Sequence, residues 1–101
     1  VLLLRRALRV RERRLPPESP HLAESLHELG GALLRRRAPG DAEAALPLLS
    51  RAAQLRERRA GRRSLAYAAS LQQLGQAHLQ LGLHGEARLY LQAALALRER
   101  L

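Results

Sequence analysis

The side chains that could do chemistry are few in this sequence, and they lie far apart. There is no cysteine, so the chain offers neither a thiol nucleophile nor a thiolate ligand for zinc. The four histidines are dispersed: His21, His27, His78 and His84. None belongs to an H-E-x-x-H motif, and no Ser–His–Asp set can be argued around Asp41, the only aspartate. We therefore expect a protein that is not an enzyme and that uses no metal and no cofactor.

A row of glutamines is better suited to binding than to catalysis. An amide side chain both donates and accepts hydrogen bonds, so it can satisfy a peptide main chain without requiring a charge. Four glutamines recur within one predicted helix: Gln72, Gln73, Gln76 and Gln80. For any single one of them we favour an ordinary solvated helix face, which is common. For the face as a group we favour binding.

Arginine gives the chain a formal net charge of +9, with 18 arginines and no lysine against 9 acidic residues. The arginines gather in the segments 5–14, 35–37 and 56–63. Those near helix ends complement the helix dipole, which is the interpretation that we favour. The alternative is a surface that binds an acidic peptide, RNA or another polyanion. RNA is disfavoured because only Tyr67 and Tyr90 could stack on bases.

The composition predicts an all-α fold. Leucine, alanine, arginine, glutamate and glutamine are strong helix formers, and the only β-branched residues are Val1 and Val10. No apolar run approaches the roughly 20 residues needed to span a bilayer, so we expect no membrane association. The lack of cysteine fits a reducing compartment, and we expect a cytoplasmic protein.

Prolines and glycines divide the chain into helices. Pro16, Pro17 and Pro20 end one helix and allow the next to start near Ser19 or Pro20. Asp41 follows a Pro-Gly loop and is expected to cap a helix. Farther along, Gly61 and the segment 82–85 provide breaks, and a serine at 64 could cap a helix. The predicted helices span residues 1–14, 20–36, 41–59, 63–81 and 84–100. Short connections make neighbouring helices antiparallel, as in stacked hairpins.

The sequence repeats. Residues 3–13, 48–58 and 90–100 align and all end in Arg-Glu-Arg, at spacings of 45 and then 42 residues. Residues 23–34 and 68–79 also align, at a spacing of 45. A period in this range is typical of helical solenoids. The chain therefore contains two units and a leading half unit, and we expect it to be a segment of a longer array.

The residues of the second unit match a known pattern: Leu71, Leu74, Gly75, His78, Ala87, Leu91 and Ala94. The first unit supplies the corresponding set with three more residues between its helices: Leu26, Leu29, Gly30, Leu33, Ala45, Leu49 and Ala52. Both sets resemble the tetratricopeptide repeat (TPR), and specifically the longer variant of kinesin light chains and nephrocystin-3-like proteins. His78 stands at a bulky core position, where we expect it to pack between helices.

The resemblance implies a short right-handed TPR solenoid of about five helices. Residues 1–15 would be the second helix of a preceding repeat, residues 16–59 repeat one and residues 60–101 repeat two. In this family the first helix of each unit lines a concave groove that holds a peptide. The groove residues implied by register are Glu24, His27, Glu28, Gly31, Arg35, Ala69, Gln72, Gln73, Gln76 and Gln80. A basic edge would consist of Arg35, Arg36 and Arg37.

The predicted function is a scaffold that binds a peptide or a partner protein, for cargo binding or complex assembly. The alternative is a basic helical-repeat surface that binds nucleic acid or another polyanion. We expect protein partners rather than nucleic acid. We also expect some self-association, because the ends of an array expose apolar helix faces, such as that of residues 1–4.

Overall fold

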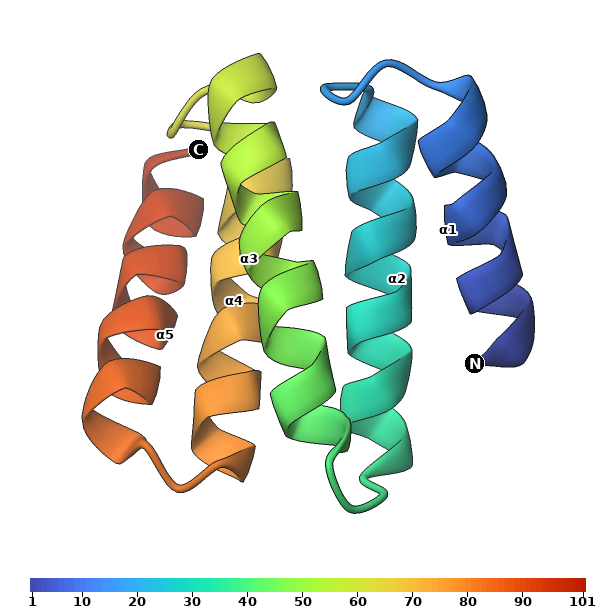
Figure 1. Ribbon diagram of the computed structural model, residues 1–101. Coiled ribbons are helices and arrows are strands. Elements are labelled where there is room, and N and C mark those ends of the chain that lie inside the picture. Colours follow the sequence, from blue (N-terminus) through green and yellow to red (C-terminus); the bar gives the residue numbers. More distant parts are fainter.

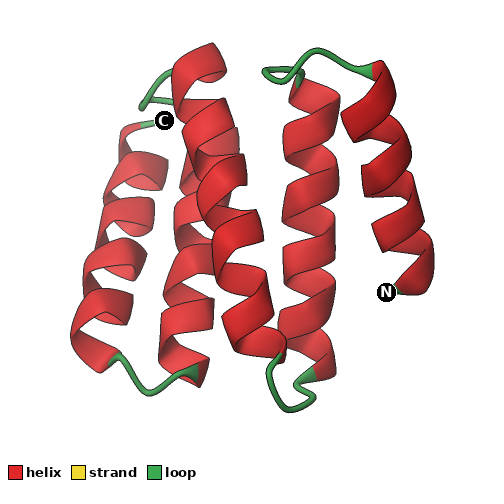
Figure 2. Cartoon of the chain, in the orientation of Figure 1, coloured by secondary structure: helices red, strands yellow, loops and turns green.

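The computed structural model describes residues 1–101 as five α-helices joined by short loops (Figure 1). Figure 2 shows that the chain contains no strand. The helices are α1 (Leu2–Arg14), α2 (Pro20–Arg36), α3 (Asp41–Ala60), α4 (Leu65–Gln80) and α5 (His84–Arg100). The all-α prediction is confirmed, and no predicted helix boundary is wrong by more than two residues. None of the helices combines the length and the apolar character needed to cross a membrane.

Serine starts two of the helices. The Ser19 hydroxyl accepts a hydrogen bond from the main-chain N–H of His21, and Pro20 takes the first helical position, where no N–H is needed. The Ser64 hydroxyl accepts one from the N–H of Tyr67 at 3.1 Å. These contacts satisfy N–H groups that a helix start would otherwise leave unpaired.

The prediction that Asp41 caps α3 is wrong. Gly40 precedes the helix in the left-handed conformation (φ 81°), and Asp41 is the first helical residue. Its buried carboxylate accepts two hydrogen bonds from the Arg36 guanidinium, at 2.8 and 2.7 Å, and one from the N–H of Ala38 at 2.9 Å. The hydrogen bonds from Arg36 are the largest cause that holds the pKa of Asp41 below its ordinary value. Asp41 therefore closes the loop between α2 and α3.

Each helix packs antiparallel against the next, and the array is curved. Consecutive helices are in contact throughout, and α2 also touches α4. The backbone of α3 approaches neither α1 nor α5 in this way, and α3 reaches α1 through the ion pair between Arg51 and Glu12 at 2.9 Å. On one side of the layer α2 and α4 are in contact, whereas on the other side the backbones of α1, α3 and α5 stay apart. The layer therefore bends toward α2 and α4, and these two helices line the concave face. In Figure 1, α4 lies behind α3 and parallel to α2.

Leucines of α2 form the centre of the core. Leu26, Leu29 and Leu33 are at most 1% exposed, and Leu49 of α3 is fully buried against them. A Cβ atom at Gly30 would lie 2.6 Å from Leu49 Cγ, so only glycine allows α2 and α3 to approach this closely. The equivalent glycine of α4, at position 75, stands in the same relation to α5. The recurrence of these glycines is thus a packing requirement.

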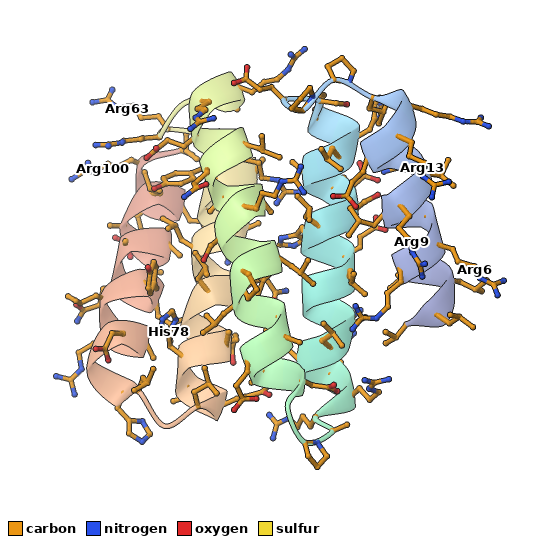
Figure 3. The ribbon with its side chains drawn as sticks, viewed as in Figure 1. Arg6, Arg9, Arg13, Arg63, His78 and Arg100 are labelled. Atoms are coloured by element: carbon orange, nitrogen blue, oxygen red, sulfur yellow. The ribbon has the colours of Figure 1, made fainter.

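His78 packs between α4 and α5, as its position in the repeat predicts. Figure 3 shows His78 between these two helices. Its ring stacks on Tyr90 with centroids 5.0 Å apart, and its Nδ1 lies 2.7 Å from the carbonyl oxygen of Leu74. A histidine with both contacts serves as a core side chain. No three histidine, cysteine, aspartate or glutamate side chains lie together in a group that could hold a metal ion.

Candidate peptide-binding groove

The concave side of α2 and α4 contains an open polar hollow of about 430 Å³. Its walls come from the C-terminal half of α2, the residue that follows it, and the matching half of α4. The lining residues are Gly31, Leu34, Arg35, Arg37, Gln73, Gln76 and Gln80. Five of them are groove residues expected from the sequence. The hollow is rich in side-chain donors, with two guanidinium groups and three amides.

Two local features shape this hollow. Gly31 is buried, and its lack of a side chain leaves room for those of Arg35 and Gln73. A Cβ atom at this position would lie 3.3 Å from Arg35 Nη1 and 3.6 Å from Gln73 Nε2. Gln80 donates its amide N–H to the carbonyl oxygen of Leu34 at 3.0 Å. This bond joins the ends of α2 and α4 and fixes the width of the hollow at that end.

The other expected groove residues lie outside the hollow, in the N-terminal halves of the same two helices: Glu24, His27, Glu28, Ala69 and Gln72. Burial is the largest cause that lowers the pKa of His27, the nearby charges of Arg56 and Arg35 act in the same direction, and together they bring it to about 4. His27 is therefore neutral at physiological pH. The groove therefore has an open, basic half and an N-terminal half that contains this neutral imidazole and the exposed Glu24 and Glu28.

Two polar atoms in the N-terminal half are buried without a hydrogen-bond partner. They are His27 Nδ1 and Gln72 Oε1, from positions that are equivalent in the two repeats. A buried polar atom left unpaired costs about 1–3 kcal/mol.

Arg56 was not expected at this site. Its Nη1 donates to the carbonyl oxygen of Ala66 at 3.2 Å and to the Ser70 hydroxyl at 3.1 Å, so it joins the end of α3 to the start of α4. Burial is the largest influence on the Arg56 pKa and lowers it, while the charge of Glu24 acts in the opposite direction. The sequence places Arg56 at a helix end, where the helix dipole explains it. The signal that could have identified it is the serine at 70, which aligns with another at 25.

The three arginines of the expected basic edge do not all lie at the groove. Arg36 lies in the ion pair with Asp41 and contributes to the α2–α3 loop instead of the groove. Arg35 and Arg37 line the hollow. Arg37 adopts the left-handed conformation (φ 56°) that ends α2. The basic edge of the groove is therefore formed by two arginines, Arg35 and Arg37.

Other arginines are exposed at the two ends of the array. Figure 3 shows Arg6, Arg9 and Arg13 projecting from α1 on one side, and Arg63 and Arg100 projecting near the C-terminus on the other. The positive charge is thus spread along the molecule and is not confined to one face. No single surface holds most of it.

Residues 36–100 match the tetratricopeptide repeat family. The match covers α3, α4 and α5, together with the last residue of α2. No curated protein matches the chain significantly. Repeats of this family are generally non-catalytic modules for interactions between proteins.

Proposed function

The chain belongs to the tetratricopeptide repeat family, and we propose that it binds an extended, acidic segment of a partner protein in the groove between α2 and α4. One observation carries this proposal: the polar hollow that unites Arg35 and Arg37 with three glutamines. The two cations can bind carboxylates, and the amides can bind the main chain of the same peptide. An extended peptide suits the site because its main-chain groups are free to accept these hydrogen bonds.

The charges along the groove give the peptide a preferred direction. Acidic side chains of the peptide would lie at Arg35 and Arg37, near the C-terminal ends of the two helices. Glu24 and Glu28 lie in the opposite half and disfavour acidic residues there. A matching ligand is acidic at one end and neutral or basic at the other.

We also propose that the repeats are of the longer type found in kinesin light chains and nephrocystin-3-like proteins. The 45-residue spacing of the first two matching segments supports this assignment, since that variant is longer than the ordinary 34-residue repeat. On this basis residues 1–15 are the second helix of a preceding unit, residues 16–59 are repeat one and residues 60–101 are repeat two. An adaptor or assembly role in the cytoplasm accords with such a module.

The test compares peptides that differ in the position or in the charge of their acidic residues. Binding to the chain is measured by fluorescence anisotropy for an acidic decapeptide, its scrambled version and its glutamine-substituted version. The variant R35Q/R37Q removes both cations from the hollow. The matched control R58Q/R59Q removes two exposed arginines of α3 outside it.

We expect R35Q/R37Q to weaken binding about ten- to hundredfold, because each charge-assisted hydrogen bond contributes about 1.5–3 kcal/mol before solvent competition. The control should change binding less than threefold. If both variants lost the same affinity, and the scrambled peptide bound as tightly as the original, binding in the groove would be contradicted. The polyanion alternative predicts that an oligonucleotide binds more tightly than any peptide and that its affinity falls steeply with salt.

A further inference from the structure

An arginine of α3 reaches across to α1 on the convex side of the array. Arg51 Nη1 donates to Glu12 Oε2 at 2.9 Å, and the two side chains are 42% and 39% exposed. Glu12 is the acid of the first Arg-Glu-Arg segment. The backbones of α1 and α3 do not approach each other, so this ion pair spans the gap between the two helices.

The next pair of helices on this side, α3 and α5, keeps the acid of the ion pair and loses the arginine. In the alignment of residues 3–13, 48–58 and 90–100, Glu57 corresponds to Glu12, and Ala93 corresponds to Arg51. Ala93 is exposed. The helix α5 therefore offers Glu57 no guanidinium at the position from which Arg51 reaches Glu12.

A hollow lies between α3 and α5 where the equivalent of that ion pair is missing. It has two neighbouring parts, of about 190 and 350 Å³, which share Glu57, Tyr67 and Leu71 as walls. Tyr90 lines the smaller part, and Ala93 lines the larger part. Both α3 and α5 pack on α4, which forms the floor, so the hollow is made by helices within the two repeats and not by an end of the array.

The side chains of the hollow suit a guanidinium group. Glu57 supplies a carboxylate, which can accept two parallel hydrogen bonds from arginine. The chain has no phenylalanine or tryptophan, and both of its tyrosines, Tyr67 and Tyr90, line the smaller part, where their rings can attract a cation. Burial is the largest cause that raises the pKa of Tyr67, and the nearby Glu57 carboxylate acts in the same direction. Tyr90 is held in place because its ring stacks on His78.

Arg62 is the present partner of Glu57. Its Nε donates to Glu57 Oε2 at 2.9 Å, but its side chain is 80% exposed. An exposed ion pair of this kind contributes little to stability, and a carboxylate can accept hydrogen bonds from more than one donor. Arg62 is therefore a weak competitor for Glu57.

We propose that the hollow between α3 and α5 binds an arginine side chain of a partner protein, in the position that Arg51 holds one repeat earlier. The guanidinium bonds to Glu57 and lies against the tyrosine rings. Arginine suits the site better than lysine, because its planar group forms paired bonds with a carboxylate and stacks on aromatic rings. Arg62 and Arg100 also line the hollow and favour a partner segment with acidic residues beside its arginine.

The test uses the two tyrosines as reporters of binding. Because the chain has no phenylalanine or tryptophan, the ring protons of Tyr67 and Tyr90 can be followed by NMR during a titration of the full chain. The probe is N-acetyl-arginine N-methylamide. The corresponding citrulline compound has nearly the same shape without the charge, and the lysine compound has the charge without the planar group.

Three variants of the chain change the hollow: E57Q removes its carboxylate, R62Q removes the competing arginine, and A93R supplies a guanidinium from α5 itself. The matched control is E43Q, because Glu43 is an exposed acid of the same helix outside the hollow. Circular dichroism checks that each variant folds. The exposure of Arg62 and Ala93 favours folding of the second and third variants.

We expect the arginine probe to shift both tyrosines saturably, with an affinity in the millimolar range. E57Q should weaken binding about tenfold or more, whereas E43Q should change it less than about twofold. R62Q should strengthen binding about two- to fivefold, because the probe no longer competes for the carboxylate. A93R should abolish binding, because its own guanidinium fills the hollow as Arg51 fills the equivalent gap.

Several outcomes would overturn the proposal. They are the absence of saturable shifts at the tyrosines, equal binding of the citrulline compound, and equal losses in E57Q and E43Q. A lysine compound that bound as tightly as the arginine probe would refute the assignment to arginine. Weaker binding in R62Q would show that the probe does not compete for Glu57. Because E57Q leaves Arg35 and Arg37 of the groove unchanged, this proposal and the proposed function can fail separately.

Discussion

Replacing Gly30 by alanine tests whether α2 and α3 approach as closely as the core requires. The added Cβ would lie 2.6 Å from both Cγ and Cδ2 of Leu49, which is far inside a normal carbon–carbon contact. Leu49 is fully buried, so its side chain cannot turn toward solvent to relieve the overlap. Overpacking of this kind costs about 1–3 kcal/mol, and we expect the upper part of that range.

The same substitution improves helix propensity, which must be set against the overlap. Alanine is favoured over glycine inside a helix by about 1 kcal/mol. We therefore expect Gly30→Ala to lower the free energy of unfolding by about 2 kcal/mol, or the Tm by roughly 8–16 °C for a domain of this size. Urea unfolding followed by circular dichroism at 222 nm measures the difference.

Two other glycines serve as controls for this prediction. Gly75→Ala meets Leu91 at 2.7 Å, but Leu91 is only half-buried and can turn toward solvent, so we expect a smaller loss. Gly85→Ala meets no atom within 4 Å in the first turn of α5 and should be neutral or slightly stabilising. If Gly30→Ala were as stable as Gly85→Ala, the close approach of α2 and α3 would be refuted.

Two further predictions concern the polar residues. Ser70→Ala removes an acceptor from half-buried Arg56 and should lower the free energy of unfolding by about 1–2 kcal/mol, as measured in urea. Ser50→Ala, which removes no hydrogen bond, should lower it by less, and equal losses would contradict a contribution of the Arg56–Ser70 hydrogen bond to stability. Protonation of His27 should destabilise the chain between pH 6.5 and about 4, because the unfolded state binds the proton with the ordinary pKa and the folded state resists it. The full loss of unfolding free energy is reached only below pH 4. The pKa shift alone would correspond to about 3 kcal/mol, but the ring is partly exposed and solvent screens its charge, so we expect a loss of about 1–2 kcal/mol. The variant His27→Gln, which carries the residue found at position 72, should lack this part of the pH dependence, and an unchanged profile would show that His27 does not cause it.

The helices could be predicted from the sequence because their signals are local. Ser19 and Ser64 begin helices by bonding to N–H groups two and three residues away, and Gly61 ends one. Asp41 was misassigned because its partner, Arg36, lies across a loop, and spacing alone does not reveal which acid a given arginine will meet. The same ion pair removes Arg36 from the basic edge.

The groove could be predicted only in part. Register alone identifies the helix faces that line it, and it found Arg35 and the glutamines that surround the hollow. It could not show that Arg56 reaches across from α3 to the start of α4. The hydrogen bond from Arg56 to Ser70 joins residues 14 positions apart, and such a contact is visible only when two hairpins are packed together.

Arg56 connects the groove to the contact between repeats. Its guanidinium bonds to Ser70 of α4, while its charge adds to burial, the larger cause, in lowering the pKa of His27 in α2. Because the pKa of His27 is about 4, the charge of the groove does not change between pH 5.5 and 8. The attraction for an acidic peptide therefore comes from arginines, which stay charged throughout this range. Peptide affinity should accordingly be insensitive to pH near neutrality and sensitive to salt, and the combination separates this groove from a site that uses histidine to bind its ligand.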